Sequence, residues 1–415
     1  MTEQAKVPAI RFAGFTDPWE QRKLGDVASS FDYGLNAAAT EYDGQNKYLR
    51  ITDIDDETHE FSKSDLTTPL ADLAMSADYL LKEGDLLFAR TGASVGKTYL
   101  YRQFDGMVYF AGFLIRARIG EGADPEFAYQ ATLTDAYKKY VAITSQRSGQ
   151  PGVNAQEYAD YQLMLPSKTE QQQIGMTLRS LDDLITLHQR KYDKLVIFKK
   201  SMLEKMFPKD GESVPEIRFA GFTDPWEQRK LGDVASSFDY GLNAAATEYD
   251  GQNKYLRITD IDDETHEFSK SDLTTPLADL AMSADYLLKE GDLLFARTGA
   301  SVGKTYLYRQ FDGMVYFAGF LIRARIGEGA DPEFAYQATL TDAYKKYVAI
   351  TSQRSGQPGV NAQEYADYQL MLPSKTEQQQ IGMTLRSLDD LITLHQRKLE
   401  LLQNIKKSLL DKMFV

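Results

Sequence analysis

The segment LPSKTEQQQIGMTLRSLDDLITLHQRK, residues Leu165–Lys191, decides the fold, and it recurs letter for letter as Leu372–Lys398. It opens with a capping box, in which the Ser167 side chain can accept a hydrogen bond from the Glu170 N–H while the Glu170 carboxylate reaches back. The apolar residues that follow keep a helical spacing. The segment therefore predicts a helix that begins directly after Pro166.

The apolar residues of this helix have the 4-3-4-3 spacing of a coiled-coil seam. The seam residues are Ile174, Leu178, Leu181, Ile185, His188, Tyr192, Leu195, Met202 and Met206, and in the second occurrence Ile381, Leu385, Leu388, Ile392, His395, Leu399, Leu402, Leu409 and Met413. A lysine, Lys199 or Lys406, occupies one seam position in each helix. Such a helix is roughly 60 Å long, so we expect the two helices to bury their seams against each other in antiparallel fashion. The alternative is that each lies on its own domain.

The recurrence extends far beyond the helix. Ile10–Lys191 is repeated without a change as Ile217–Lys398, an offset of 207 residues. A repeat of this length is a domain, so the chain is a covalent pseudo-dimer that arose by recent duplication or by fusion. The sequence predicts two domains, 1–165 and 209–372, two spacer helices, 166–208 and 373–415, and pseudo-two-fold symmetry.

The domains have the pattern of a mixed α/β fold, which gives an α+β class for the whole chain. Runs rich in β-branched and aromatic residues predict strands, and these runs are Asp85–Arg90, Thr98–Tyr101, Met107–Phe110 and Phe113–Ile119. Pro125–Val141 has apolar residues at helical spacing and predicts one helix.

Composition excludes several classes of protein. The chain has no cysteine, which excludes disulfides and sulfur-ligated metal sites. The N-terminal residues resemble no signal peptide and no apolar run is long enough to span a membrane, so we expect a cytoplasmic protein. The net charge is −13, from 47 basic and 60 acidic residues, which argues mildly against nucleic-acid binding.

Two motifs suggest an active site but do not support one. Thr91–Thr98, TGASVGKT, resembles a phosphate-binding loop, but only three residues separate its glycines and a strand rather than a helix is predicted to follow. The acidic cluster at Asp53, Asp55, Asp56, Glu57 and Glu60 is more typical of a solvated edge than of a metal site. No catalytic constellation is found, and we expect neither a catalytic nor a metal site.

Charge read locally weakens the objection to nucleic acid. Arg90–Arg118 contains five basic residues and one acidic residue, and 136–156 contains three basic residues and no acidic one. Side chains that commonly bind base edges and phosphates, such as Ser94, Gln150 and Asn154, lie among them. The alternative is that these are ordinary solvated charges.

The sequence resembles the DNA-specificity subunits of Type I restriction-modification systems. The motifs that carry the resemblance occur in the family's order, and most occur twice: Pro8–Trp19, the loop Arg90–Lys97, the turn Gln150–Asn154, the junction Leu165–Gln171, Leu181–Arg190 and Lys205–Pro208. The family's layout of recognition domain, helix, recognition domain and helix is the layout reached above from the repeat.

The resemblance implies a function and partners. The chain would have no activity of its own and no cofactor. It would bind double-stranded DNA through its two domains and two modification (methyltransferase) subunits along its helices, and restriction subunits would join the complex. Those partners would supply S-adenosylmethionine, ATP and Mg. Family members commonly have two different domains, whereas identical domains predict a split palindromic site. A coiled-coil scaffold with ligand- or protein-binding domains is the alternative.

The resemblance also suggests that two loops of each domain reach toward DNA. The residues expected to contact DNA are Arg90, Thr91, Ser94, Lys97, Lys138, Lys139, Arg147, Gln150 and Asn154 in the first domain, and Arg297, Thr298, Ser301, Lys304, Lys345, Lys346, Arg354, Gln357 and Asn361 in the second.

Overall fold

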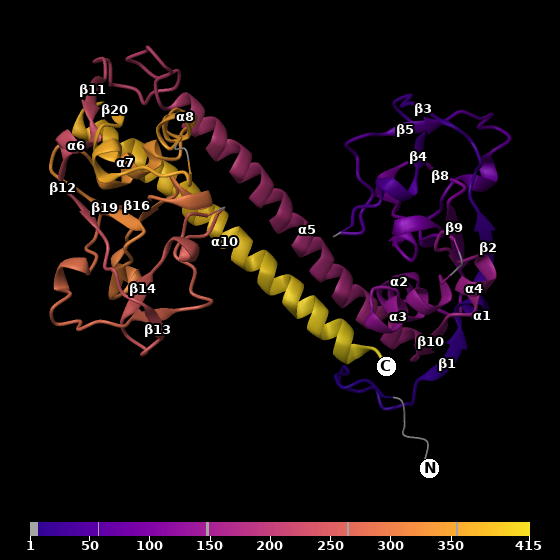
Figure 1. The fold of residues 1–415 in the computed structure, drawn as a ribbon. Helices are drawn as coiled ribbons and strands as arrows, with labels where there is room; N and C mark the ends of the chain where they lie inside the picture. Colours follow the sequence, from indigo (N-terminus) through magenta and orange to yellow (C-terminus); the bar gives the residue numbers. More distant parts are fainter. Residues whose placement is uncertain (1–6, 57, 147–148, 264, 354–355) are drawn as a thin grey trace. The chain divides into compact units, whose positions relative to one another are not determined.

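A computed structural model describes residues 7–56, 58–146, 149–263, 265–353 and 356–415 (Figure 1). The chain divides into two compact units, one formed by Met1–Gln189 with Arg397–Val415 and the other by Arg190–Gln396. Each unit therefore contains one domain, the first half of the helix that follows it and the last half of the other long helix.

The elements of the first repeat are β1 (Glu20–Lys23), α1 (Leu24–Val27), β2 (Ala28–Tyr33), β3 (Ala39–Glu41), β4 (Lys47–Leu49), β5 (Thr67–Pro69), β6 (Asp85–Ala89), β7 (Thr98–Leu100), β8 (Val108–Phe110), β9 (Leu114–Ile119), α2 (Pro125–Ala131), α3 (Asp135–Thr144), α4 (Ala155–Ala159), β10 (Gln162–Leu165) and α5 (Lys168–Lys205). The predicted strands correspond to β6, β7, β8 and β9.

The second repeat contains the same elements in the same order: β11 (Glu227–Lys230), α6 (Leu231–Val234), β12 (Ala235–Tyr240), β13 (Ala246–Glu248), β14 (Lys254–Leu256), β15 (Thr274–Pro276), β16 (Asp292–Ala296), β17 (Thr305–Leu307), β18 (Val315–Phe317), β19 (Leu321–Ile326), α7 (Pro332–Ala338), α8 (Asp342–Thr351), α9 (Ala362–Ala366), β20 (Gln369–Leu372) and α10 (Lys375–Met413).

The centre of each domain is an antiparallel four-stranded sheet, in the order β2-β9-β6-β7 in the first repeat. Residues alternate between its two faces, as a strand period of two requires. Leu86 and Phe88 of β6 join the core that contains α2, α3 and α4, whereas Leu87 and Ala89 join a second core with residues of β4 and β8. The sheet therefore separates two apolar layers.

The single helix predicted over Pro125–Val141 is wrong, because the structure contains two helices, α2 and α3, in this region. The Thr132 hydroxyl donates to the Tyr129 carbonyl (2.6 Å), and the Thr134 hydroxyl accepts from the Tyr137 N–H and so caps α3. Threonine side chains that bond to nearby backbone groups favour helix ends over helix interiors.

The start of α5 differs in one respect from a full capping box. The Ser167 hydroxyl accepts from the Glu170 N–H (3.4 Å), as predicted. The Glu170 carboxylate, however, is fully buried and accepts two hydrogen bonds from the Arg11 guanidinium, at 2.6 and 2.7 Å. This ion pair attaches the N-terminal segment to the first turn of the helix. Arg218 and Glu377 make the same pair in the second repeat.

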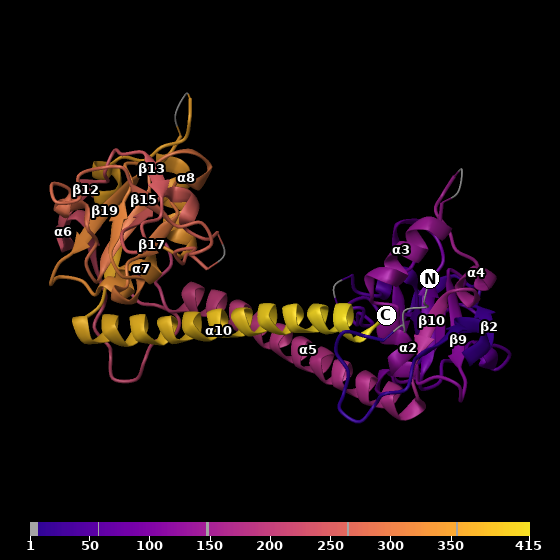
Figure 2. The same ribbon diagram turned by 90° about the horizontal axis from the view of Figure 1, so that it is seen from below.

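The long helices pair in antiparallel fashion within each unit, which confirms the predicted coiled coil. In the first unit, Ile174 and Leu178 of α5 share a core with Leu410 and Met413 of α10, and farther along α5 Asp182 pairs with Lys406 (2.5 Å). Residues farther along α5 contact residues that come earlier in α10, so the two helices run in opposite directions. Figures 1 and 2 show the C-terminus beside the first domain.

The seam lysines have partners in the facing helix. The Lys406 ammonium binds Asp182, and the Lys199 ammonium binds Asp389 in the second unit. Asp182 also accepts a hydrogen bond from the Gln130 amide of α2 (2.7 Å), so one carboxylate links the domain and both helices. The two lysines that interrupt the apolar seam therefore form ion pairs across the coiled coil.

Each domain core is completed by the end of a helix from the other repeat. Phe414, which follows α10, packs on Trp19 and Phe127 of the first domain, with ring centroids 6.5 and 5.0 Å apart. Phe207, which follows α5, packs in the same way on Trp226 and Phe334 of the second domain. Among the described residues, no helix is both long enough and apolar enough to span a membrane.

Candidate nucleic-acid interface

The two loops predicted to reach DNA lie side by side in each domain. Thr91 forms an antiparallel bridge with Gly152, the Gly92 N–H donates to the Pro151 carbonyl (3.0 Å) and the Val153 N–H donates to the Arg90 carbonyl (2.9 Å). Residues about 60 positions apart in the sequence thus form one surface. Arg147 and Arg354, also predicted to contact DNA, lie outside the described residues.

The glycine-containing loop does not form a phosphate-binding helix start. Gly92–Ser94 is a single 3-10 turn, and Thr98 then begins strand β7. Gly96 has a φ of 86°, a conformation that favours glycine, and it lies against Val141 of α3. The buried Tyr158 hydroxyl accepts from the Gly96 N–H and donates to the Ala89 carbonyl (2.7 Å), and burial raises its pKa. The loop is therefore fixed on α3 and α4.

Arg90 lies at the centre of this surface. Its guanidinium lies over the Tyr33 ring, 5.1 Å from the centroid, and 6.0 Å from the centroid of Phe113. Arg297 repeats both distances with Tyr240 and Phe320, and its Nε donates to the Gly319 carbonyl (3.0 Å). Cation–π contacts of this kind orient a guanidinium without neutralising it.

Lys97, which is predicted to contact DNA, lies in a largely buried environment. Its side chain is only 11% exposed, and its ammonium binds the Ile54 carbonyl (2.9 Å) and the Asp56 carboxylate. Lys304 makes the same contacts with Ile261 and Asp263. These lysines attach the loop to the acidic segment, and their contact with DNA remains a prediction.

The other predicted residues divide into structural and exposed groups. The Asn154 side chain caps α4 by accepting from the Glu157 N–H (2.9 Å), and Asn361 caps α9 in the same way. Gln150 and Gln357 are exposed, with an amide near Gly92 or Gly299. The half-buried loop hydroxyls are Thr91, Ser94, Thr298 and Ser301.

The lysines of α3 and α8 are exposed beside this surface. Lys138 and Lys345 make loose ion pairs with the aspartate three residues earlier, at 3.3 and 3.4 Å. Lys139 is exposed, whereas its equivalent, Lys346, binds Asp210 (2.7 Å). Such weakly held cations can exchange their partners for phosphates.

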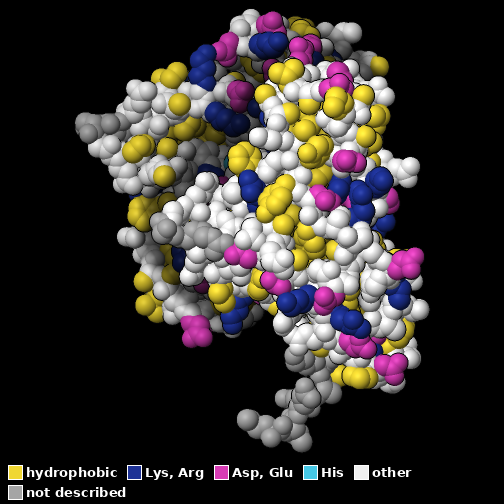
Figure 3. Space-filling view, turned by 90° about the vertical axis from the view of Figure 1, so that its right-hand side faces the viewer, with side chains coloured by type: hydrophobic (Ala, Val, Ile, Leu, Met, Phe, Trp, Pro, Cys, Tyr) yellow, Lys and Arg dark blue, Asp and Glu magenta, His cyan; other side chains and the backbone are white. Residues whose placement is uncertain are grey.

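Much of the local positive charge found in the sequence is neutralised within the domain. Arg118 binds Asp85, Arg116 binds Asp32 and Arg102 binds Glu126. The face shown in Figure 3 likewise carries Lys and Arg side chains interspersed with Asp and Glu. The number of basic residues in a stretch of sequence is therefore larger than the number of unpaired positive charges on the surface of the domain.

The acidic segment provides no metal site among the described residues, where no group of three potential ligands converges. Asp53 binds Arg50 and Asp55 accepts from Thr58, so these carboxylates have other partners. His59 belongs to the same segment and has a φ of 55°, and its Nδ1 is 3.1 Å from the Thr98 carbonyl oxygen. Burial lowers the pKa of its imidazole.

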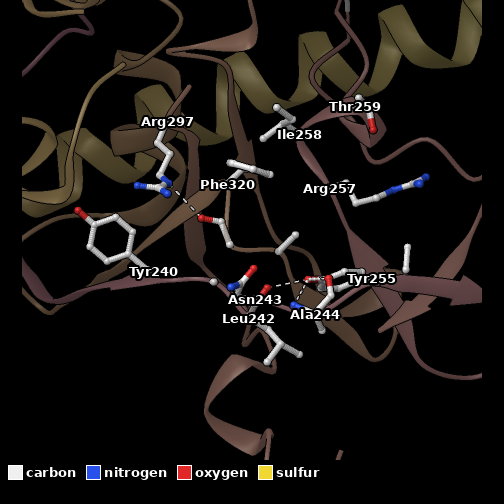
Figure 4. Close-up of a pocket in the computed structure, with 14 residues that line it drawn as sticks. Tyr240, Leu242, Asn243, Ala244, Tyr255, Arg257, Ile258, Thr259, Arg297 and Phe320 are labelled. Atoms are coloured by element: carbon white, nitrogen blue, oxygen red, sulfur yellow. Dashed lines mark hydrogen bonds between the residues drawn. The ribbon is translucent and has the colours of Figure 1, made fainter. Parts of the chain in front are cut away.

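A pocket of about 720 Å³ lies next to Arg297 in the second domain, and sequence reasoning did not predict it. Figure 4 shows Arg297 and Tyr240 at one side of it and Arg257 and Thr259 at the other. Its residues come from β12, β13 and β14, from the segments that follow β12, β14 and β16, and from the loop between β18 and β19, which only the folded chain brings together. The exposed Asn243 also lines it.

Comparison with known proteins gives a consistent result. The family model described as "Type I restriction modification DNA specificity domain" matches residues 16–196 and again 223–404. The MjaVIII specificity subunit of a Type I restriction enzyme from Methanocaldococcus jannaschii is 21% identical, with 95% of this chain and 92% of the relative covered. The putative MjaX specificity subunit from the same organism is 24% identical over 52% of each chain.

A solved structure shares the fold. The crystal structure of the S subunit of a Type I restriction-modification system from M. genitalium aligns with a TM-score of 0.66 at 15% identity, and the alignment covers 99% of each chain. The arrangement of domain, helix, domain and helix described above is therefore found in an experimental structure.

Proposed function

The chain belongs to the Type I restriction-modification DNA specificity family, whose subunits recognise DNA and have no catalytic activity of their own, and we propose that it reads a split palindrome. Each domain would read one short half-site. Because the two domains have the same sequence and the same local geometry, the second half-site would be the reverse complement of the first, separated by a gap of unread bases.

One observation carries this proposal, which is that the main contacts of the candidate surface recur in the second domain. Arg90 and Arg297 lie at the same distances from equivalent rings, and Lys97 and Lys304 make equivalent bonds. Each domain core also contains the helix end of the other repeat, so the two units are built alike. Proteins with two-fold related readers bind palindromic sites whose half-site spacing follows their own dimensions, so the paired helices would set the gap.

We further propose that the helices bind two modification (methyltransferase) subunits, and that restriction subunits join through them. Leu184 and Leu187 are exposed on α5, at 43% and 46%, and Leu391 and Leu394 repeat them on α10. Equivalent apolar surfaces suit two identical partners. S-adenosylmethionine, ATP and Mg would be bound by these partners rather than by this chain. A role on chromosomal DNA would place the complex in the cytoplasm.

The proposal is tested by sequencing the methylome of cells that co-express the chain with its modification subunit. We expect one methylated motif with two identical, inverted half-sites and a fixed gap. Only asymmetric motifs, or no motif at all, would contradict the proposal. A salt titration with the purified complex complements this test, because specific DNA binding should weaken steeply as salt displaces phosphate contacts, whereas a protein-binding scaffold would show no DNA binding.

A further inference from the structure

Arg90 differs from the other arginines of the first domain in having no carboxylate partner among the described residues. The other arginines that the structure describes in this domain each form an ion pair, namely Arg11, Arg22, Arg50, Arg102, Arg116 and Arg118. The domain has a net negative charge, yet the half-buried Arg90 guanidinium is not neutralised by a described carboxylate. Its positive charge is therefore available to a ligand.

The guanidinium is also held in one orientation. In the second domain, the rings of Tyr240 and Phe320 lie 5.1 and 6.0 Å from the Arg297 guanidinium carbon, and Nε is bonded to Gly319 (Figure 4). In the first domain, Arg90 has the same ring contacts, and its Nε is buried without a hydrogen-bond partner. The terminal Nη atoms have no acceptor in the part of the chain that the structure describes. Two parallel donors therefore remain for a ligand.

The geometry favours a base edge over a phosphate. Phosphates are commonly bound by exposed cations, and Lys138 and Lys139 of the adjacent helix α3 are exposed. A planar fork with its orientation fixed by packing matches two acceptors in one plane, and O6 and N7 of guanine present such a pair in the major groove. The exposed Asn243, which lines the pocket beside Arg297, shows that further polar groups are available for neighbouring bases.

We infer that Arg90 and Arg297 each read one guanine, so that every half-site contains a G·C pair at the position nearest these side chains. This inference rests on the proposed function. It names the residue that recognises one base of each half-site, and it identifies that base as guanine.

The duplicated chain permits a test with an internal reference. The purified complex of the chain with its modification subunit would select from a duplex library randomised at the half-sites of the wild-type motif. We expect Arg90→Ala to relax one G·C position in one half-site, with discrimination reduced on the order of 10- to 100-fold. The other half-site, read by the unchanged second domain, should keep its guanine, so the selected motif loses its symmetry.

Two further variants sharpen the test. Arg90→Lys keeps the positive charge but not the fork, and it should relax the same position. Arg22→Ala removes the same charge from the exposed arginine of β1 and should leave the motif unchanged. Arg297→Ala should give the same relaxed motif as Arg90→Ala, because the site is read in either orientation.

Several results would overturn the inference. An unchanged motif, relaxation at a position that is not G·C, or an equal loss of binding to every library member would each show that Arg90 does not read guanine. A wild-type complex that selects no split palindrome would instead overturn the proposed function. The two failures are therefore distinguishable.

Discussion

At the scale of single residues, each domain contains an ion pair with a fully buried carboxylate, Arg11–Glu170 in the first domain and Arg218–Glu377 in the second. Glu170 is fully buried, and the Arg11 side chain is 10% exposed. The hydrogen bonds that Arg11 donates to Glu170 hold the pKa of the guanidinium above its ordinary value. Removal of one partner leaves a buried charge without compensation, which typically costs about 3–5 kcal/mol.

We therefore expect Glu170→Ala to lower the unfolding temperature of the first domain well below that of the second. Differential scanning calorimetry would separate the two transitions. Glu20→Ala is the matched control, because its partner Arg22 is 54% exposed and surface pairs contribute only about 0–1 kcal/mol. Equal effects of the two substitutions would show that burial of the Glu170 pair contributes little.

The buried histidine of each domain predicts the direction of pH dependence. Burial lowers the pKa of His59 and His266, so these imidazoles stay neutral in the folded protein at a pH where the unfolded chain already binds a proton. Folding stability should therefore fall as the pH falls below the ordinary histidine pKa of about 6.5. We expect His59→Asn with His266→Asn to reduce this loss, since asparagine tolerates the positive φ. Urea unfolding at pH 7.5 and 5.5 measures the loss of folding stability in the wild type and in the double variant. The same loss in both proteins would contradict the prediction.

At the scale of the elements, the carboxylate shared by three elements should matter more than its neighbour. Asp182→Ala leaves the 18%-exposed Lys406 and the amide of Gln130 without their partner, and we expect a loss of about 1–3 kcal/mol. Asp183→Ala removes an exposed carboxylate from the same turn and serves as the control. Thermal unfolding monitored by circular dichroism compares the two variants, and similar midpoints would refute the assigned role of Asp182.

The elements also show how far sequence reasoning reaches. The four strands from Asp85 to Ile119 follow from local composition, and the coiled-coil seam follows from local periodicity. The break between α2 and α3 was missed because Thr132 ends α2 and Thr134 caps the start of α3 through side-chain hydrogen bonds, and neither a proline nor a glycine marks the break. The environment of Lys97 was also missed, since its partners lie about 40 positions away. Contacts between distant segments leave no periodic signal.

At the scale of the whole molecule, the exchanged helix ends predict how a single repeat should behave. A chain of residues 1–208 lacks Phe414, the residue that packs on Trp19 and Phe127, but it contains the equivalent Phe207. Two such chains can each supply the missing ring to the other. We expect this half-length chain to form a dimer, as measured by light scattering, and Phe207→Ala to weaken that dimer. A stable monomer would contradict the prediction.

The identical repeats have a further consequence at the level of the gene. A crossover at equivalent codons of the two repeats would delete 207 codons and leave one domain followed by a helix that ends in Leu399–Val415. That helix end already packs against the first domain in the intact chain. The shortened product would therefore reassemble as a pair with the same recognition surfaces, and the host genome would retain its methylation pattern after losing half of the gene.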